Sequence, residues 1–314
     1  MAASTVGRTL GRIVLQAAVV AAVAVAGALP AYAAPPAVHG GGHGGGGTVA
    51  PTGNDVSYPQ CGGSLPSNAA FGIVGVNDGL ASTLNPCFGP SSAYPSYTQS
   101  ELYWAVASTI GGTPQPGASL YVNTADPGNV VNGTIIGDWP TSGNTPDGSC
   151  ATTTVTLSGV TSTVGENSTA CAWQYGYDMA TRDAGWLTDA ATAINAQQPG
   201  VPVPTTASAY PWWLDVETGN SWLADTTMNV ADLQGMVAGF TAAGAASVGV
   251  YSTSSQWGTI TGGSTAGSLG GLPNWIPGAR NLSGAERNCS DASFTGGTVT
   301  LTQWFANPDG DYHC

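Results

Sequence analysis

The sequence predicts an α/β protein whose main part is one large domain with a mainly parallel sheet. Short apolar runs bounded by turn-forming residues recur along the chain, and stretches with helical periodicity lie between many of them. Strands that alternate with helices are joined by crossover connections and therefore run parallel. The length from residue 55 to residue 314 fits a single domain, because α/β barrels routinely reach roughly 250 residues without division.

The expected strands are short and rich in apolar or β-branched residues. They cover residues 71–77, 119–123, 213–217, 247–252 and 299–305. The expected helices cover residues 97–108, 172–197 and 229–243. In the third helix, apolar residues recur at steps of three and four and so share one face, namely Val230, Leu233, Val237 and Phe240. Asn229 is the expected N-cap of this helix, and Gly244 follows it as a C-cap residue.

Residues 127–170 interrupt this alternation. The segment is rich in glycine, threonine, serine and asparagine, and it predicts a loop-rich insertion. We find no internal repeat in the chain.

The N-terminal residues have the pattern of a secretory signal peptide. Arg8 and Arg12 precede an apolar stretch, and the small residues at 31–33 suit cleavage after Ala33. We therefore expect residues 1–33 to be removed and the protein to be secreted. Residues 34–54 contain two histidines among many glycines and predict a flexible tether, which leaves 55–314 as the folded domain.

Charge is sparse and strongly acidic. The chain has no lysine, and after loss of the signal peptide 18 acidic residues face 3 arginines, a formal charge of −15. Nucleic acids and anionic membranes are therefore not expected partners, because binding to them needs clustered basic residues. We expect a monomer.

Six cysteines follow the tether, an even number that predicts three disulfides in an exported protein. Six cysteines allow fifteen connectivities, and sequence alone does not choose among them. Pairing of neighbours along the chain is our expectation, because each pair brackets a loop-rich stretch: Cys61 with Cys87, Cys150 with Cys171, and Cys289 with Cys314.

The residue types exclude several kinds of catalysis. Beyond the tether the sole histidine is His313, so a serine or cysteine nucleophile would lack its usual base. A zinc site would lack its imidazole ligands, and there is no lysine for a Schiff base or a phosphate-binding loop. We expect no metal and no cofactor, and proton transfer is left to carboxylates.

Asp215 and Glu217 are the best candidates for that role. Residues two apart in a strand point to the same face, which would place both acids inside the sheet while Leu214 and Val216 face the helices. Two neighbouring buried acids cannot both ionise easily, so the pKa of one should rise. Glycoside hydrolysis uses such a pair. The alternative is a surface strand with two solvated acids.

Further motifs resemble a known family. Asp55 begins an Asp-Val-Ser segment with a glutamine nearby, and Asp-Val-Glu follows in mid-chain. Later come a strand ending at Tyr251, a strand bearing Trp275, and Gln303-Trp304 followed by Asp309-Gly-Asp311. In this order the motifs resemble glycoside hydrolase family 25 lysozymes, over nearly all of the folded domain.

This resemblance implies a somewhat irregular (β/α)8-type, TIM-like barrel with its site at the C-terminal ends of the strands. It implies hydrolysis of the β-1,4 bond after N-acetylmuramic acid in peptidoglycan. Glu217 would be the general acid/base, Asp215 and Asp55 would tune it and support positive charge, and Asp311 would assist. The residues expected to bind the sugar are Trp213, Tyr251, Trp257, Trp275, Gln303 and Trp304.

Two other functions compete with this one. A non-catalytic domain that binds carbohydrate or cell wall could keep the barrel, since fold does not fix function. A purely structural exported protein is less consistent with paired inward acids, because buried charge without a partner is destabilising. Convergence of Asp55, Asp215 and Glu217 on one open groove separates the enzyme from its rivals.

Overall fold

The computed structural model describes residues 52–67, 69–108, 117–198 and 200–314. The expected signal peptide and most of the expected tether lie outside the described residues. The first strand, β1, begins at Thr52, so residues 52–54 belong to the barrel and not to the tether. They are held there by pairing with residues 310–312 near the C-terminus.

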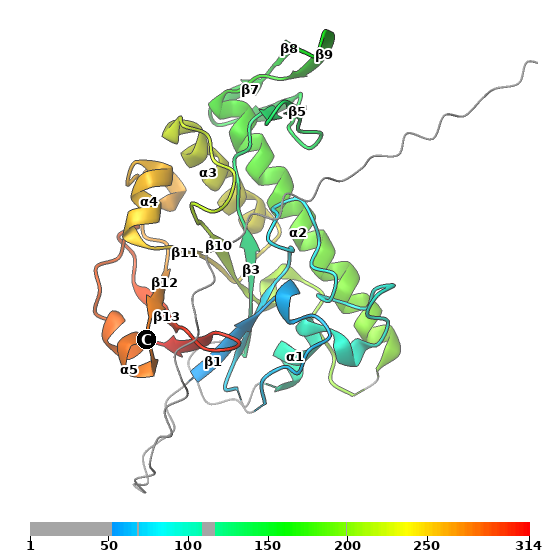
Figure 1. Cartoon of the computed structure of the whole chain (residues 1–314), viewed down its shortest axis with the longest axis vertical. Coiled ribbons are helices and arrows are strands. Elements are labelled where there is room, and N and C mark those ends of the chain that lie inside the picture. The colour runs from blue at the N-terminus through cyan, green and yellow to red at the C-terminus, as the bar shows by residue number, and fades with distance from the viewer. Residues whose placement is uncertain (1–51, 68, 109–116, 199) are drawn as a thin grey trace, which may run out of the picture. The chain divides into compact units, whose positions relative to one another are not determined.

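Eight strands close into a barrel, which confirms the predicted α/β barrel class (Figure 1). In spatial order they are β1 (Thr52–Val56), β14 (Gly310–His313), β13 (Val299–Trp304), β12 (Asn274–Ala279), β11 (Ser247–Tyr251), β10 (Pro211–Asp215), β3 (Ala118–Asn123) and β2 (Gly72–Gly75). Neighbours are parallel except at β14, which is antiparallel to both β13 and β1. The barrel is thus irregular, because a hairpin and not a helical crossover delivers its last strand.

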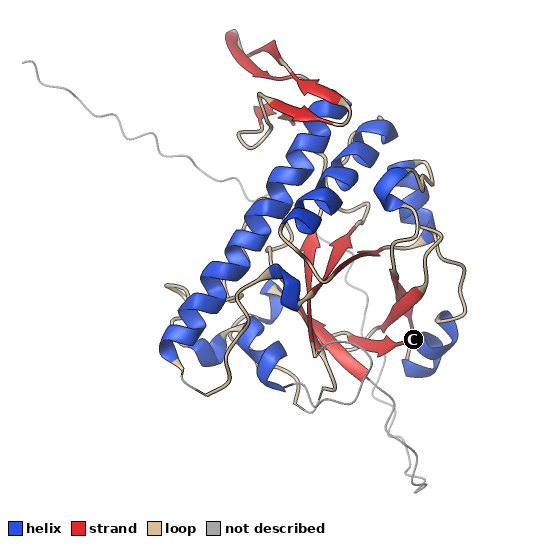
Figure 2. Cartoon of the chain, turned by 180° about the vertical axis from the view of Figure 1, so that it is seen from behind, coloured by secondary structure: helices blue, strands red, loops and turns tan. Residues whose placement is uncertain are grey.

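Five α-helices are formed by the described residues, and they surround the strands (Figure 2). They are α1 (Glu101–Ser108), α2 (Thr169–Gln197), α3 (Thr226–Ala242), α4 (Ser254–Thr261) and α5 (Leu282–Asn288). None of them combines the length and apolarity needed to cross a lipid bilayer. The sequence did not predict α4 or α5, which have 8 and 7 residues.

The start of α3 corrects one prediction. Asp225 is the N-cap, because its side chain accepts a hydrogen bond from the Thr227 N–H. Asn229 lies inside the helix, where its amide nitrogen donates to the carbonyls of Leu223 and Ile260. Gly244 follows the helix with a φ of +80°, as expected for a residue after a C-cap.

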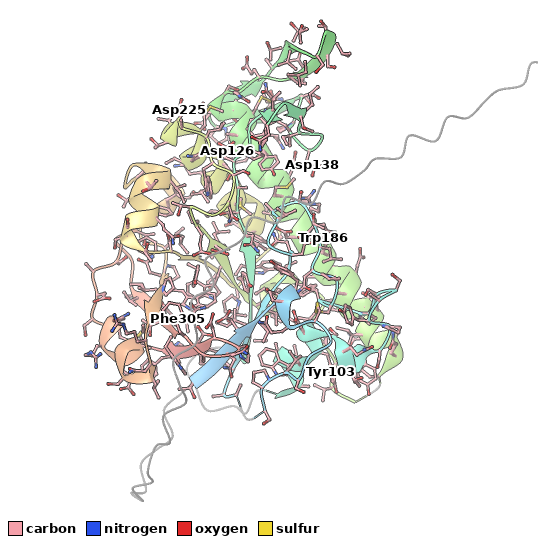
Figure 3. The ribbon with its side chains drawn as sticks, viewed as in Figure 1. Tyr103, Asp126, Asp138, Trp186, Asp225 and Phe305 are labelled. Carbon is pink, nitrogen blue, oxygen red and sulfur yellow. A yellow bond between two sulfur atoms is a disulfide. The ribbon has the colours of Figure 1, made fainter. Side chains whose placement is uncertain are left out.

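The insertion is more regular than the sequence indicated. It forms three two-stranded pairs: β4 (Val130–Val131) with β5 (Thr134–Ile135), β6 (Gly143–Thr145) with β7 (Gly148–Cys150), and β8 (Thr152–Leu157) with β9 (Val160–Gly165). These pairs gather at the N-terminal end of α2 (Figures 1 and 2). Arg182 of α2 forms an ion pair with Asp138 of the insertion at 2.9 Å and lies over the Trp186 ring (Figure 3).

The alternation of side chains along β10 separates two hydrophobic clusters. Trp212 and Leu214 point outward into the large cluster between the sheet and the helices, where Trp212 packs on Phe240 of α3. Trp213 points inward and joins a small cluster with Phe71, Ile73, Trp275 and Leu301. This inner cluster fills the barrel, so any pocket among its strands must lie at one end.

The three predicted disulfides are confirmed. Cys61 pairs with Cys87, Cys150 with Cys171, and Cys289 with Cys314. The third links the end of α5 to the residue after β14 and therefore holds the antiparallel strand that closes the barrel.

Removal of this third link should destabilise the whole domain. The pair closes a loop with a sequence separation of 25 residues, and opening it should lower the free energy of unfolding by about 3 kcal/mol. Urea unfolding of the Cys289→Ala/Cys314→Ala variant measures this, with wild type as reference. An unchanged unfolding midpoint would show that β14 is held without the disulfide.

Candidate active site

A pocket opens at the C-terminal ends of the barrel strands, with a volume of about 220 Å³. Six residues expected at a site from the sequence line it: Asp55, Asp215, Glu217, Tyr251, Trp275 and Gln303. Five of them lie on the strands β1, β10, β11, β12 and β13, and Glu217 lies in the loop after β10. The predicted convergence of Asp55, Asp215 and Glu217 in one pocket is therefore observed.

The position of Glu217 differs slightly from the prediction. Strand β10 ends at Asp215, so Glu217 lies two residues beyond it and not within the strand. Extended geometry continues far enough for Val216 to join the helix-facing cluster, and Glu217 still faces the pocket. Asp215 is 6% exposed, whereas Glu217 is only half-buried. Glu217 is thus the member of the pair that a ligand reaches more easily.

Asp55 is held by a chain of hydrogen bonds that crosses the barrel. The Gln303 Nε2 donates to Asp55 Oδ2 at 2.9 Å, and the Tyr251 hydroxyl donates to Gln303 Oε1 at 3.0 Å. Burial raises the pKa of Asp55 to about 6, and the bond from Gln303 opposes that rise. Gln303 was expected to bind sugar, but both ends of its amide are engaged in positioning Asp55.

Asp311 lies beneath the pocket and does not line it. It is fully buried, and Trp275 Nε1 donates to its Oδ1 at 3.0 Å. Burial raises the pKa of Asp311 well above its usual value, and the charge of Asp55 raises it further. The interaction with the Asp311 carboxyl in turn lowers the pKa of Asp55 and so favours its charged form.

Asp215 and Glu217 influence each other's ionisation. Burial raises the pKa of Asp215 well above its usual value, with further contributions from the charges of Glu217 and Asp55. In the amide orientation that satisfies its polar atoms, Asn123 donates to Asp215 Oδ2 at 3.0 Å. Burial also raises the pKa of Glu217, while Gln256 lowers it through a long hydrogen bond of 3.4 Å. We expected the pKa of one acid to rise, whereas the pKa values of both Asp215 and Glu217 are raised.

Aromatic rings form the base and one wall of the pocket. Trp275 contacts Tyr251 and Tyr121 edge-on, with ring centroids 4.6 and 6.1 Å apart. Trp213 packs against Trp275 from below, at 5.9 Å, and does not line the pocket. A sugar in the pocket would therefore meet Trp275 and the two tyrosines, while Trp213 supports Trp275.

Two predicted sugar-binding tryptophans are not brought to the pocket. Trp257 is 1% exposed on α4, where it packs on Phe294 and donates to the Ser264 carbonyl. Trp304 follows the inward-pointing Gln303 on β13, so it faces outward, and its ring lies close to Gly310. Period-two alternation along β13 could have separated Trp304 from Gln303 in advance.

Five lining residues were not among the expected site residues: Ser57, Pro59, Gln60, Tyr121 and Asp309. Tyr121 lies at the centre of a strand that the sequence predicted, but nothing in the sequence told which face is inward. Asp309 contributes its carbonyl, which accepts hydrogen bonds from the Asp55 N–H and the Asn54 side chain. Only the closing of the barrel by β14 brings it there.

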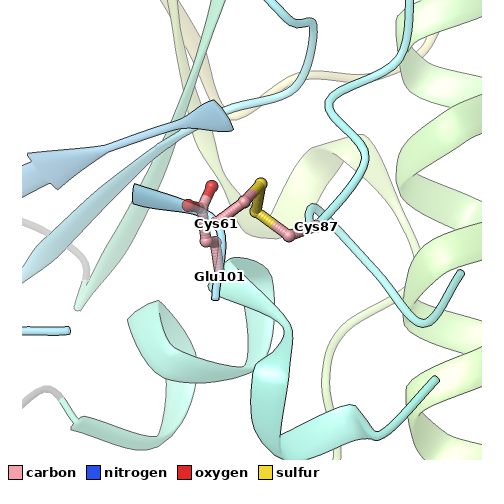
Figure 4. A group of neighbouring side chains, drawn as sticks. All are labelled: Cys61, Cys87 and Glu101. Carbon is pink, nitrogen blue, oxygen red and sulfur yellow. A yellow bond between two sulfur atoms is a disulfide. The ribbon is translucent and has the colours of Figure 1, made fainter. Parts of the chain in front are cut away.

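Among the described residues, one group meets simple distance criteria for metal ligands, and it lies outside this pocket. It consists of Cys61, Cys87 and Glu101 (Figure 4). The two sulfur atoms form a disulfide and offer no thiolate, so the group does not fit a metal site.

Part of the chain is similar in sequence to known proteins. A family model described as lysozyme-like protein 1 matches residues 205–276. That range includes Asp215, Glu217, Tyr251 and Trp275. This segment is lysozyme-like in sequence.

Two curated relatives extend the similarity. Probable GH family 25 lysozyme 4 of Dictyostelium discoideum is 33% identical over 102 residues, which are 32% of this chain and 44% of that protein. Probable GH family 25 lysozyme 2 of the same organism is 46% identical over 63 residues, 20% of this chain and 28% of that protein. The chain thus spans less than half the length of the curated relatives it matches.

Solved structures of similar proteins include a family GH25 lysozyme from Aspergillus fumigatus, with a TM-score of 0.45 and 13% sequence identity. The similarity covers 84% of this chain and 93% of that chain. A bacterial lysozyme from Streptomyces coelicolor has a TM-score of 0.43 and 15% identity, covering 85% and 93% of the two chains.

The role of Gln303 predicts a pKa shift. In Gln303→Leu, Asp55 loses a donor that favours its ionised form, so its pKa should rise above the value of about 6. Carbon-13 NMR titration of side-chain carboxyls measures this, with Asp55→Asn to assign the signal. A pKa that stays the same or falls would show that Gln303 does not stabilise the Asp55 charge.

Proposed function

We propose that this protein is a secreted glycoside hydrolase that cleaves the β-1,4 bond after N-acetylmuramic acid in peptidoglycan, as a muramidase does. The convergence of Asp55, Asp215 and Glu217 on one open pocket is the observation that carries the proposal. The similarity to lysozymes supports it further, because the segment that matches the lysozyme-like family model, residues 205–276, contains Asp215 and Glu217.

Glu217 is the proposed general acid. It is half-buried and lines the pocket, and its raised pKa keeps a proton available at a pH where an exposed glutamate has lost it. Glu217 gives this proton to the glycosidic oxygen as the bond to the sugar breaks. The resulting carboxylate then accepts a proton from the water that completes hydrolysis.

Asp55 and Asp215 are the proposed electrostatic partners. The sugar develops positive charge as its bond breaks, and carboxylates close to it stabilise that charge. No arginine or lysine is among the residues that line the pocket, so nothing there neutralises the acids. Asp55, with a pKa of about 6, carries its charge at neutral pH.

Asp311 assists through Asp55 and not through contact with substrate. It lies under the pocket, bonded to Trp275 and to Asp55. Its interaction with Asp55 lowers the pKa of Asp55 and so favours the charge that Asp55 presents to the substrate. Asp311 is therefore a positioning residue in this proposal.

Secretion fits the three disulfides, which persist in oxidising compartments. It also fits the signal-like N-terminus. A cell-wall glycan is a substrate that an exported enzyme can reach.

The Glu217→Gln variant tests the acid directly. Glutamine keeps the shape of the side chain but cannot donate a proton to the leaving oxygen, so the rate should fall by about a hundred- to ten-thousand-fold. The assay follows loss of turbidity of purified cell walls between acidic and neutral pH. Glu286→Gln, an exposed change on α5, is the matched control and should retain wild-type activity.

Two outcomes count against the proposal. Wild-type protein that binds cell-wall glycans but cleaves none of them would favour a carbohydrate-binding domain. Cleavage that survives Glu217→Gln would keep the hydrolase and reject Glu217 as its acid.

The Asp215→Asn variant tests electrostatic support. Loss of this carboxyl removes a buried acid whose ionisation is linked to that of Glu217. We expect a lower kcat with little change in KM, because the effect is largest where positive charge develops. Asp291→Asn, on the exposed surface, is the control. A rise in KM with unchanged kcat would instead assign Asp215 to ground-state binding.

A further inference from the structure

Asn123, the last residue of β3, lies beside Asp215, the last residue of β10 (Figure 1). The two are register partners in parallel strands, so both side chains point to the same face of the sheet. One end of the Asn123 amide is 3.0 Å from Asp215 Oδ2. The other carboxyl oxygen, Oδ1, is buried and has no partner among the described residues. Within the described chain, hydrogen bonding of the Asp215 carboxyl therefore depends on Asn123.

The backbone of Asn123 is held by the side chain of Asn77, which is fully buried. In a parallel ladder the Asn123 N–H would donate to the Val76 carbonyl, but that carbonyl accepts from the Asn85 N–H instead. Asn77 Oδ1 accepts from the Asn123 N–H at 2.7 Å, and Asn77 Nδ2 donates to the Asn123 carbonyl at 3.1 Å. The Asn77 side chain thus continues the sheet where β2 ends, and it fixes Asn123 in place.

Thr124, the next residue, holds the main chain of Asp215. Its N–H and its hydroxyl both donate to the Asp215 carbonyl, at 3.2 and 2.7 Å. The backbones of Asn123 and Asp215 are therefore tied to each other. The orientation of the Asn123 amide group, by rotation about its last bond, is the variable that remains.

The end of this amide that faces away from Asp215 meets an acceptor and a donor. Asn77 Oδ1 is 3.1 Å from it, and the Gly79 nitrogen is 3.3 Å from it. With Nδ2 at this end, Asn123 donates to Asn77. With Oδ1 at this end, it accepts from the Gly79 N–H. Each orientation uses one neighbour and places the other opposite a like group, so this end alone favours neither orientation.

The choice of orientation therefore falls to Asp215. An asparagine amide carries a donor at one end and an acceptor at the other. With Nδ2 toward Asp215 the amide donates to the ionised carboxylate, and with Oδ1 toward Asp215 it accepts from the protonated carboxyl. A residue with donors alone, such as arginine, would match the ionised form only.

The surroundings of Asp215 oppose its ionisation. The titratable groups whose charges interact with it are Asp55 of β1, Glu217 after β10, Tyr121 of β3 and Tyr251 of β11. No basic residue lines the pocket. Asp78, next to Gly79 in the chain, accepts from the Leu80 N–H within its own loop. A donor from Asn123 therefore favours the charged form of Asp215, which the acids around it disfavour.

We propose that Asn123 is a positioning residue of the reaction, whose amide turns with the charge of Asp215. It accepts a hydrogen bond from the protonated carboxyl at low pH. It donates one to the carboxylate at higher pH, the form that supports positive charge on the substrate. Asn77 and Gly79 hold the far end of the amide in the two cases. This inference rests on the proposed function, which assigns that charge to Asp215.

NMR spectroscopy of the wild-type protein reads the orientation directly. With Asp215 protonated, the Nδ2 protons of Asn123 lie next to the Gly79 N–H and should give a strong nuclear Overhauser effect. With Asp215 ionised they point to Asp215, and this effect should be lost with the same midpoint as the titration of the Asp215 carboxyl carbon. Asn123→Asp and Asp215→Asn assign the two signals. An effect of constant strength across that titration overturns the turning amide.

Asn123→Leu tests the role of the amide in the reaction. Leucine has a similar size but neither donates nor accepts, and the charged form of Asp215 loses the stronger hydrogen bond. The acidic limb of the activity on cell walls should therefore move to higher pH. We expect kcat to fall about tenfold, as for one hydrogen bond to a charged group, with KM within twofold.

Asn144→Leu, an exposed change on β6, is the matched control and should keep the wild-type pH profile. Thermal unfolding verifies that each variant is folded. An Asn123→Leu enzyme whose pH profile matches that of the control would reject the positioning role, because a structural contribution alone does not move the acidic limb.

The two readouts separate this inference from the proposed function. The Overhauser effect needs no hydrolysis. If the wild type cleaves no glycan while the effect follows the titration of Asp215, the proposed hydrolase fails and the pairing of Asn123 with Asp215 stands. If the wild type cleaves cell walls while the effect stays constant, the hydrolase stands and the turning amide is rejected.

Discussion

The pairing of β14 with β1 closes the barrel and brings the last acid of the chain under the first. Gly53 lies opposite Asp311 in this antiparallel pair, so Asp311 lies diagonally across from Asp55 on the neighbouring strand. Burial and the charge of Asp55 raise the pKa of Asp311, while its interaction with Asp311 lowers the pKa of Asp55. The closed barrel also brings Gln303 of β13 to Asp55, so this arrangement sets where Asp55 lies and favours its charged form.

The pocket holds a cluster of acids and no basic residue. Asp55, Asp215 and Glu217 share a pocket whose lining contains no basic residue, and burial raises the pKa of each. Such an arrangement is destabilising for an empty protein but favours a substrate that becomes positively charged. Amide donors offset part of the cost, from Gln303 to Asp55 and from Gln256 to Glu217. The scarcity of charge elsewhere in the chain makes this concentration of acids more selective.

The frame around the pocket is stiffened by covalent links at two places. The disulfide of Cys289 and Cys314 holds the closing strand, and that of Cys61 and Cys87 holds the loop beside Gln60. Trp213 and Trp275 fill the barrel below the pocket, so the acids rest on a packed base. Together these features keep the carboxyl groups in position before a ligand arrives.

The sequence by itself predicted an α/β domain with a mainly parallel sheet, several of its strands and a pair of acids at the end of one of them. These predictions were possible because alternation and turn residues are local properties of the chain. The barrel came from the resemblance to a known family, and the even number of cysteines predicted three disulfides without choosing their pairing. The sequence did not determine which tryptophans face the pocket: Trp275 points into the barrel from β12, Trp304 points outward from β13, and Trp257 is buried on α4. Nor did it assign Gln303 to Asp55, a contact between residues 248 positions apart. Tertiary structure alone decided these points, because the closure of the barrel sets which face of each strand is inside.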